Sequence, residues 1–526
     1  MMELVVAILT PLRMKFIQFF IWKPFINSTF EPQRHQNELL LKILNKNHKT
    51  VYGIEHNFSE IGNYEDYIKA VPVNSYDDLK DYIYKQDSEN VPYLTEESPV
   101  FYVLTSGTTG RSKKIPILKS SISHYRQSQQ LLAFAMYLGI PSAYKGKILA
   151  MVSPSHEGLL DTGSPYGSMS GLIYQSMPRT LRTKYVVPLH VFEMANYDEK
   201  YLAIAESALK EKNISMIATA NPTSLLKLDR VINDNADKLI ESIRSTDAER
   251  ADELQVLLAV DGSLSFAKIW PELKAITVWT GGSCGISILS LREKLPVDTR
   301  IVEVGYMSSE FRGGVTLDVL DNRQVPTFHQ NFFEFVEKDA WEDGDVEFLK
   351  LDQISPGTQY YIFVTTQTGL YRYDINDLIE VTGRFNNTPT IQFVQKGRGV
   401  TNITGEKLYE AQLLSAIHET REQQKVSFDF FIMIAYPERY EYCLYIEHTP
   451  FDTSGIETQL RKSNMEFEDK QKSGRLKPLR TVFIESGTGD LYKKYCLQQG
   501  QREGQYKLMH LQYDKDCNFD FLSCER

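Results

Sequence analysis

The sequence predicts an α/β protein with a large N-terminal domain and a small α+β domain at its C-terminal end. Short runs of β-branched and aromatic residues alternate with helical stretches through most of the chain, as in mixed, largely parallel sheets covered by helices. The glycine-rich polar stretch "KGRGVTNITG" then interrupts this alternation. We therefore expect one domain at residues 1–396 and a second at residues 397–526.

The first informative element is a strand in "SPVFYVLT" that leads into the loop "TSGTTGRSKK", residues 105–114. A helical stretch follows and is predicted to end at Gly139. Glycine-containing turns present backbone N–H groups that bind phosphate, and hydroxyls and lysines add donors and positive charge. The loop is therefore a candidate phosphate site. The spacing does not fit a Walker A loop, however, and clusters of this composition are often ordinary turns.

The rest of the chain contains further strand-like and helical stretches. The strand-like runs of the large domain lie at residues 146–153, 214–220, 275–282, 299–306 and 359–366, with helical stretches at 197–213 and 223–234. In the small domain we expect a helix over residues 407–422, with one apolar face formed by Tyr409, Leu413, Ala416 and Ile417. A hairpin of residues 428–437 and 440–448 and a strand within 479–486 are expected to follow it.

The composition is that of a globular protein with an overall negative charge. The chain has 526 residues, of which 42% are hydrophobic and 24% charged, and its net charge is −10, so we expect no nucleic-acid partner. Its five cysteines have no CxxC spacing, which argues against a disulfide framework or a zinc site and fits a reducing compartment. We expect a cytoplasmic monomer.

The apolar N-terminal stretch "MMELVVAILTPLRMKFIQFFIW" is predicted to form a helix that covers the core. Arg13 and Lys15 interrupt it, so neither half reaches the ~18 apolar residues of a membrane span. The order of its charges is also the reverse of that in a signal peptide. The alternative is contact with a membrane surface through four aromatic side chains, Phe16, Phe19, Phe20 and Trp22.

Two later motifs place polar groups inside apolar runs. "VGYMSSEFRGG", residues 304–314, contains Tyr306, which can stack on a purine, and Glu310, whose oxygens can hold Mg²⁺. "GLYRYDINDLIEVTG", residues 369–383, contains Asp377, which can accept hydrogen bonds from ribose hydroxyls. The structural alternatives are core packing for Tyr306 and a helix or turn cap for Asp377.

The order "SGTTG…K", "Y-x-S-S-E", "YRYxxxD", a hinge and "GEKLYE" resembles that of the adenylate-forming superfamily. More narrowly, the chain resembles the auxin-responsive-promoter (Gretchen Hagen) family of acyl acid–amido synthetases. Segments near residues 40–83, "QNFFEFVE" and "GQYKL" extend this resemblance over nearly the whole chain. It implies a two-domain ligase that converts ATP and a carboxylic acid into an acyl-adenylate and pyrophosphate. An amine, usually an amino acid, then takes the acyl group as an amide.

The resemblance also implies roles for particular residues. The ATP phosphates would be held by three hydroxyl side chains of the loop, those of Ser106, Thr108 and Thr109. Tyr306 would stack on adenine, Ser309 would contact the α-phosphate region, and Asp377 would bind the ribose. Glu310 would bind Mg²⁺, and Lys507 of "GQYKL" would act in the adenylation step before the mobile C-terminal domain rotates. Whether other basic residues take part is left open for Lys113, Lys114, Arg398 and Lys407.

Three positions depart from the family pattern. Met307 stands where Gly or Ala is usual, and Asp374 replaces a common arginine. Asn376 replaces the glycine before the ribose aspartate, and we expect it to preserve the turn because Asn tolerates positive φ. The acid itself is not evident from the sequence. We expect its pocket to include side chains from residues 151–175 and 190–225.

Three alternatives compete with this interpretation. The same first step serves acyl-CoA ligases, which transfer the acyl group to a thiol. "TGGSCGIS" matches the G-x-S-x-G elbow of α/β-hydrolases, with Ser283 as nucleophile and Asp318 or Asp321 and His329 as partners. The third alternative is a nucleotide-binding protein without turnover, against which the intact Glu310, Asp377 and Lys507 argue.

Overall fold

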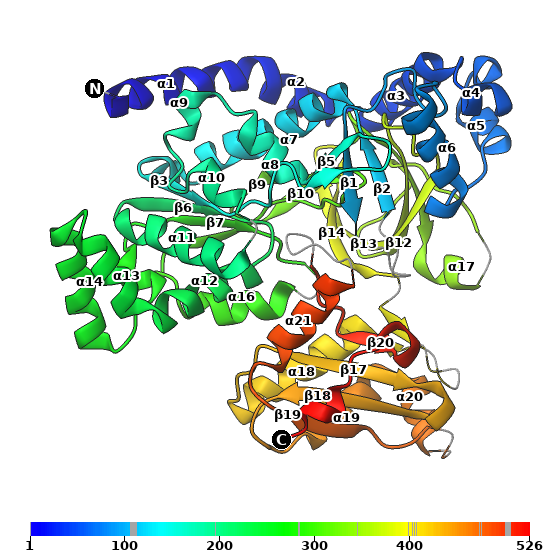
Figure 1. The fold of residues 1–526 in the computed structure, drawn as a ribbon. Coiled ribbons are helices and arrows are strands. Elements are labelled where there is room, and N and C mark those ends of the chain that lie inside the picture. The colour runs from blue at the N-terminus through cyan, green and yellow to red at the C-terminus, as the bar shows by residue number, and fades with distance from the viewer. Residues whose placement is uncertain are drawn as a thin grey trace.

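The computed structural model describes residues 2–105, 113–194, 196–281, 284–343, 346–397, 399–401, 403, 406, 408–472, 474, 476–499 and 506–526. A large domain carries the C-terminal unit on one side, and Figure 1 shows α21 (Thr488–Gln498) where the two meet. The fold is mixed α/β, as the sequence predicts.

The large domain contains a four-stranded parallel sheet. Its order is β3-β6-β7-β8, and the strands are β3 (Lys147–Ala150), β6 (Ile214–Ala218), β7 (Ala275–Val278) and β8 (Arg300–Glu303). Each strand lies inside a run predicted from sequence. Side chains alternate between two cores because successive residues of a strand point to opposite faces. Ile148 and Met216, which pair in register, belong to one core, and Leu149 and Ile217 to the other.

Helices cover both faces of this sheet. The Leu149 face packs against α11 (Tyr197–Lys210), α12 (Thr223–Asp234) and α13 (Ala236–Arg244). The Met216 face packs against α7 (Lys119–Gly139), which ends at the predicted glycine. Figure 1 shows α11 to α13 on one side of the sheet and α7 with α1 (Met2–Ile17) on the other.

A second four-stranded sheet is antiparallel throughout, which corrects the expectation of largely parallel sheets. Its order is β11-β12-β13-β14, formed by β11 (Phe332–Glu337), β12 (Gln359–Thr365), β13 (Tyr373–Phe385) and β14 (Thr388–Lys396). Short connections such as the turn at Asn386, with φ of 51°, join neighbouring strands here. Parallel pairing instead requires long crossovers, usually helical.

The hydroxyl-rich loop joins two strands rather than a strand and a helix. β1 (Phe101–Thr105) pairs antiparallel with β2 (Lys113–Ile117), and α7 begins only after β2. β1 also pairs parallel with β5 (Pro165–Gly167), which pairs with β4 (Gly158–Leu159).

The remaining elements of the large domain surround these sheets. They include α2 (Lys23–Ser28), α3 (Pro32–Asn47), α4 (Val51–Glu55), α5 (Tyr64–Ala70), α6 (Tyr76–Glu89), α8 (Met169–Gln175), α9 (Arg179–Arg182), α10 (Leu189–Phe192), α14 (Ala248–Asp261), α15 (Phe266–Ile269), α16 (Cys284–Arg292), α17 (Lys338–Asp343) and the hairpin of β9 (Gly314–Asp318) with β10 (Arg323–Pro326).

The C-terminal unit is an α+β sandwich around the sheet β19-β18-β17-β20. The predicted hairpin is present as β17 (Phe431–Tyr436) and β18 (Glu441–Glu447), and β19 (Arg480–Ile484) and β20 (Leu511–Tyr513) flank it in parallel. α18 (Glu410–Gln424) buries Leu413, Ala416 and Ile417, whereas Tyr409 lies in the short strand β16 (Leu408–Tyr409). α19 (Ser454–Ser463) and α20 (Met465–Lys472) complete the unit. The boundary between residues 396 and 397 remains our proposal.

The N-terminal helix covers part of the core, as predicted. Met14 and Ile17 of α1 are buried against Phe134 of α7, and Trp22 in the following π-helical turn packs on the same ring at 5.2 Å. Phe16, Phe19 and Phe20 are instead 55%, 56% and 69% exposed. Among the described residues, no helix is long and apolar enough to cross a membrane. Contact of these rings with a membrane surface stays an alternative predicted from the sequence.

Candidate active site

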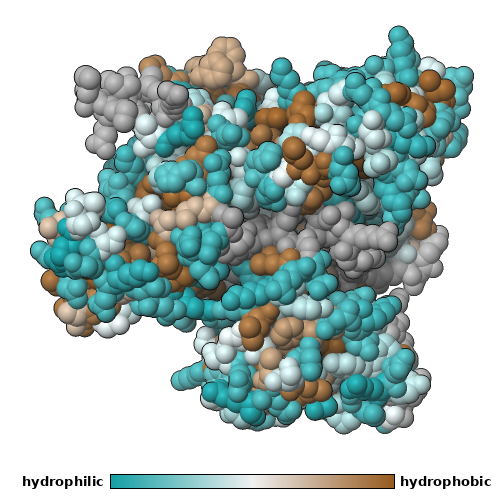
Figure 2. Space-filling model, viewed as in Figure 1, coloured by the Kyte–Doolittle hydropathy of each residue, from teal (hydrophilic) through white to brown (hydrophobic). Residues whose placement is uncertain are grey.

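A cavity of about 1920 Å³ opens at the carboxyl ends of the parallel sheet. Ligands of open α/β sheets commonly bind at this edge. The residues predicted for the nucleotide site that the structure describes all line it, namely Tyr306, Ser309, Glu310, Asp377 and Lys507. The surface is indented where the C-terminal unit meets the large domain (Figure 2). Outside the described residues lie several of the predicted ones: Ser106, Thr108, Thr109, Ser283, Arg398 and Lys407.

Tyr306 and Asp377 form a buried pair inside this cavity. The Tyr306 hydroxyl donates a hydrogen bond of 2.6 Å to Oδ2 of Asp377, and the two residues are 5% and 1% exposed. The Tyr306 ring stacks on Phe393 with centroids 5.8 Å apart and planes 13° apart. On another side of the Tyr306 ring lies Gly313. Only glycine fits at this position, because a Cβ there would lie 2.4 Å from Tyr306 Cδ1. An adenine ring stacked on Tyr306 would therefore need Phe393 to move.

A bulge in β13 directs Asp377 into the cavity. Ile362 of β12 pairs with Asp377 while the next residue, Phe363, pairs with Asp374, so that Ile375 and Asn376 are extra residues. Such bulges re-aim side chains beside active sites. Asn376 has φ of 55°, which confirms the expectation that this asparagine preserves the turn. Its N–H donates to the carboxylate of Asp374 at 2.7 Å, so Asp374 caps this turn.

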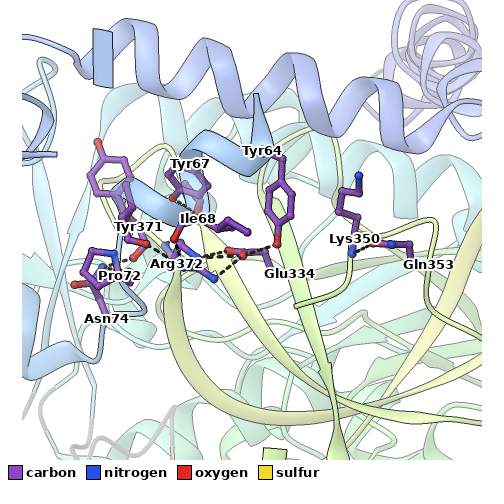
Figure 3. Close-up of polar contacts among 12 residues, drawn as sticks. Tyr64, Tyr67, Ile68, Pro72, Asn74, Glu334, Lys350, Gln353, Tyr371 and Arg372 are labelled. Carbon is purple, nitrogen blue, oxygen red and sulfur yellow. Dashed lines mark hydrogen bonds and ion pairs between the residues drawn. The ribbon is translucent and has the colours of Figure 1, made fainter. Parts of the chain in front are cut away.

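A buried ion pair anchors the chain just before this bulge (Figure 3). Arg372 has φ of 41° and its Nε lies 3.1 Å from both carboxylate oxygens of Glu334 on β11. Its Nη1 donates to the carbonyl of Val71 at 2.9 Å, and Tyr64 of α5 donates to Glu334 at 2.9 Å. Arg372 and Glu334 are 4% and 0% exposed, so the pair is fixed in the protein interior beside β13.

Glu310 places a carboxylate in the cavity. The residue is 8% exposed, and no hydrogen bond or ion pair joins its carboxylate to any described residue. Its charge contributes to the raised pKa values of Tyr76 and Tyr125, after the larger effect of burial. No group of three or more His, Cys, Asp or Glu in the described ranges could hold a metal by itself. A cation here would therefore need oxygens from a ligand or from water.

Lys507 reaches the cavity from the C-terminal unit. Its Nζ lies 4.4 Å from the ring centroid of Trp279 and 5.1 Å from that of Phe393, the ring on which Tyr306 stacks. The neighbouring carbonyl of Tyr506 accepts a 2.9 Å hydrogen bond from Asn221 of the large domain. The C-terminal unit thus places its lysine at the Phe393 ring, on which Tyr306 also stacks.

The two lysines beside the hydroxyl-rich loop differ in their surroundings. Lys113 lines the cavity, where its Nζ donates to the Tyr373 hydroxyl at 3.0 Å and lies 5.5 Å from the Tyr76 ring centroid. Lys114 also lines the cavity, but its Nζ lies 5.8 Å from the ring of Tyr84, a residue that is 53% exposed. Lys113 is therefore the better placed of the two to meet an anion.

Glu410 holds the backbone next to Lys507. Its carboxylate accepts a hydrogen bond from the N–H of His510, and its position at the start of α18 ties that helix to the Lys507 segment. Burial raises the pKa of the Glu410 carboxyl to about 7, against the lowering effects of the His510 and Leu511 N–H groups and of Lys507. Sequence reasoning missed this residue although it lies in the quoted motif "GEKLYE".

The raised pKa of Glu410 predicts a pH-dependent stability. The folded state keeps the proton up to about pH 7, whereas an unfolded chain releases it near the ordinary value of 4.5. The associated stability is therefore complete below pH 4.5 and is lost as the pH rises through 7, by up to about 3 kcal/mol.

The variant Glu410→Gln tests this assignment because glutamine resembles the protonated form of the side chain. We expect the unfolding free energy of this variant, relative to the wild type, to be higher at pH 8 than at pH 5. The control Glu419→Gln, exposed on the same helix, should show no such difference, and an equal effect of Glu410→Gln at both pH values would refute the assignment.

The residues predicted to assist Ser283 in the hydrolase alternative are His329 and either Asp318 or Asp321. Their surroundings do not support that role. His329 lies with its ring centroid 4.6 Å from Phe25, and its Nε2 lies 2.8 Å from Gln330 Nε2. Burial lowers its pKa to about 3, which makes it a poor general base. Asp318 forms an ion pair with Arg323 in the β9–β10 hairpin, and Asp321 is within 3.8 Å of the same arginine.

Two solved structures share the fold of this chain over most of its length. The GH3.15 acyl acid amido synthetase structure matches with a TM-score of 0.85 and 21% identity, covering 96% of each chain. A 2-hydroxyisobutyryl-CoA ligase in the postadenylation state matches with a TM-score of 0.55 and 12% identity, covering 92% of this chain and 90% of the other. The fold is therefore that of the adenylate-forming ligases, with a separate C-terminal domain.

Family models identify the narrower group. The chain matches the GH3 family N-terminal domain over residues 22–297, the central domain over 325–396 and the C-terminal domain over 411–516, and it belongs to this family, the Gretchen Hagen family indicated by the sequence motifs. The Arabidopsis thaliana 4-substituted benzoates-glutamate ligase GH3.12 is 23% identical over 548 residues, covering 92% of this chain and 95% of that protein. The indole-3-acetic acid-amido synthetase GH3.17 of the same species is 24% identical and covers 90% of each chain.

Proposed function

We propose that the protein is an ATP-dependent ligase that adenylates a carboxylic acid and transfers the acyl group to an amine, in most cases an amino acid. The observation that carries this proposal is the convergence of Glu310, Asp377 and Lys507, from three separate motifs, on one cavity. Membership of the GH3 family supports it. So does the presence, in one cavity, of a buried carboxylate without a partner among the described residues and of a lysine from the C-terminal unit.

The chemistry explains why these groups are needed. A carboxylate oxygen of the acid attacks the α-phosphorus of ATP and pyrophosphate leaves, which turns a poor electrophile into an acyl-adenylate. Negative charge accumulates between the carboxylate and the phosphate in this step, so cations and oriented donors stabilise the transition state. The amine then attacks the acyl carbon and loses a proton, and AMP leaves.

Glu310 fits the role of a Mg²⁺ ligand. Mg²⁺ in nucleotide sites is held by one or two carboxylates together with phosphate oxygens and water, which fits one carboxylate that has no partner in the described ranges better than a cage of protein ligands. The ion would neutralise charge on the phosphates during the displacement. The residues at the phosphates would be Ser106, Thr108, Thr109 and Ser309. Their assignment remains a proposal from the motif.

Asp377 is proposed to bind the ribose, with Tyr306 holding its carboxylate in place. Asp377→Asn is expected to lower acid-dependent ATP–pyrophosphate exchange about a hundredfold, mainly through a higher KM for ATP, because a charge-assisted hydrogen bond is worth about 2–3 kcal/mol. Tyr306→Phe keeps the ring and removes only the donor, so we expect a loss nearer tenfold. Steady-state kinetics at varied ATP would measure both. A KM for ATP unchanged in Asp377→Asn would exclude the ribose assignment.

Lys507 is proposed to act in adenylation only. We expect Lys507→Ala to lower ATP–pyrophosphate exchange at least a hundredfold, since it removes a cation from the developing charge. Amide formation from synthetic acyl-adenylate should stay within about threefold of wild type, because rotation of the C-terminal domain would move Lys507 away from the site before that step. Lys494→Ala, exposed on α21, is the matched control. Equal losses in both half-reactions would instead indicate a structural role.

The acceptor is tested by competition. Purified protein would be incubated with ATP, Mg²⁺, an active acid, all common amino acids and coenzyme A, and the products identified by mass spectrometry. We expect an N-acyl amino acid as the main product. An acyl thioester as the main product would overturn the proposed amine transfer. A monomeric state and a cytoplasmic location remain predictions from the sequence.

A further inference from the structure

The cavity is larger than one nucleotide site requires. Sites for single drug-sized ligands usually measure about 300–1,000 Å³, whereas this cavity measures about 1920 Å³. Besides the site residues described above, its lining includes Met14 and Ile17 of the N-terminal helix and Met136 of α7. The cavity therefore continues away from the Asp377 end toward α1. We call this part the α1 branch.

The α1 branch runs along one face of the parallel sheet. Its floor consists of Ile148 and Met216, which share a face and pair in register, and of Ala218 further along the same face. Its roof consists of Leu132, Ala133 and Met136 of α7 together with Met14 and Ile17 of α1. Figure 1 shows α1 lying across the same side of the sheet as α7. The walls are thus predominantly apolar.

The length of the branch follows from the strand beneath it. The lining continues from Ser153, Thr219 and Val304, beyond the carboxyl ends of the strands, to Gly146 and Tyr144, which precede β3. β3 contains four residues, which corresponds to roughly 13 Å at about 3.3 Å per residue. Three bonds of an extended chain advance about 3.3–3.6 Å. The branch therefore matches an extended chain of about eleven bonds.

The far end of the branch is polar and positively charged. Arg13 and Lys184 line it, beside the ring of Tyr185. Arg13 forms no hydrogen bond or ion pair with any described residue, and its charge acts on the hydroxyls of Tyr144 and Tyr185. The Tyr185 hydroxyl likewise has no hydrogen-bond partner in the described ranges. Lys184 donates to the carbonyls of Tyr144 and Gly146 at 3.4 and 3.3 Å. No carboxylate occurs among the described lining residues of this end.

We propose that the α1 branch binds the body of the acid substrate, and that this acid is elongated, largely apolar and anionic at its distal end. The inference rests on the proposed function, because the reacting carboxylate must lie near Glu310 and Lys507. From there the body of the acid follows the Met216 face of the sheet. Its distal anion pairs with Arg13, the cation at the end of the branch that forms no ion pair with the described part of the chain. A charge-assisted pair of this kind is among the stronger contacts available in such a site.

The test uses straight-chain acids of about six to fourteen carbons, each as the monocarboxylate and as the α,ω-dicarboxylate. Acid-dependent ATP–pyrophosphate exchange and direct calorimetric binding of each acid would be measured for the full-length protein. We expect a preference for dicarboxylates near ten to twelve carbons. Arg13→Gln should weaken that preference on the order of tenfold to a hundredfold. The control Lys15→Gln removes an exposed charge from the same helix and should leave the preference unchanged.

A second variant tests the path of the chain. Met216→Trp fills the middle of the branch, so we expect it to exclude long acids while six-carbon acids are still bound, with melting temperatures confirming that the variants fold. Binding that responds to Arg13→Gln and Met216→Trp without any exchange would support the branch and refute the proposed ligase. Exchange with compact aryl acids at a rate that neither substitution changes would support the proposed ligase. It would refute the proposal that the α1 branch binds the acid. Absence of acid binding as well as exchange would overturn both.

Discussion

Replacing Glu310 with glutamine is expected to lower acid-dependent ATP–pyrophosphate exchange about a thousandfold. The carboxylate lines the cavity and has no protein partner in the described ranges, so its charge is available to a cation. Metal stabilisation of a phosphoryl transition state is worth several kcal/mol, and about 4 kcal/mol corresponds to a factor of a thousand. Glutamine keeps the size of the side chain and removes the charge, which separates metal binding from packing.

Two controls sharpen this prediction. The exchange rate would be measured across a Mg²⁺ titration, where the variant should require a much higher concentration than the wild type. Glu337→Gln, exposed at the end of β11, removes the same charge away from the cavity and should change the rate little. Exchange by Glu310→Gln within threefold of the wild type at every Mg²⁺ concentration would show that this carboxylate does not hold the ion.

Replacing Arg372 with methionine is expected to destabilise the large domain by about 3–5 kcal/mol. Removal of one member of a buried ion pair leaves the other charge uncompensated in the interior. In this variant the carboxylate of Glu334, which is 0% exposed, would be left without a positive partner. The measurement is the midpoint of urea unfolding, followed by a probe in the large domain. Activity should fall as well, because Arg372 fixes the backbone just before the Asp377 bulge.

The double variant Arg372→Met/Glu334→Leu provides the decisive comparison. Replacing both charges with apolar groups removes the uncompensated carboxylate, so much of the lost stability should return. The Tyr64 hydroxyl would lose its acceptor, and this limits the recovery. A double variant that is as unstable as the sum of its single changes would contradict an ion pair that acts as one unit.

The strands of the parallel sheet could be predicted from the sequence because they are short apolar runs. The helices between them have a clear repeat of apolar residues. The stretch at residues 223–234, for example, coincides with α12. The run at residues 359–366 was also recognised as a strand, but a buried apolar strand does not reveal the direction of its neighbours. β2 was missed because Lys113, Lys114 and Pro116 are typical of a loop. Proline is tolerated there because β2 is an edge strand.

The site residues that carry recognisable chemistry were predicted, and those that position them were not. Asn376 was expected to preserve its turn and does so, because its residue type reports directly on backbone conformation. The partners Phe393 and Trp279 are ordinary aromatic residues in sequence, and only the fold brings them to Tyr306 and Lys507. The position of Arg13 at the cavity was likewise hidden, since an apolar helical pattern does not specify which surface the helix covers.

The central claim, acyl-adenylate formation, is tested most directly by trapping with hydroxylamine. Purified protein would be incubated with ATP, Mg²⁺, hydroxylamine and a panel of aryl, indolyl, fatty and dicarboxylic acids, and hydroxamate, pyrophosphate and AMP would be quantified. We predict hydroxamate and AMP in equal amounts with at least one acid class, and their loss in Glu310→Gln. Bound ATP without hydroxamate from any acid, or release of ADP in place of AMP, would contradict the account.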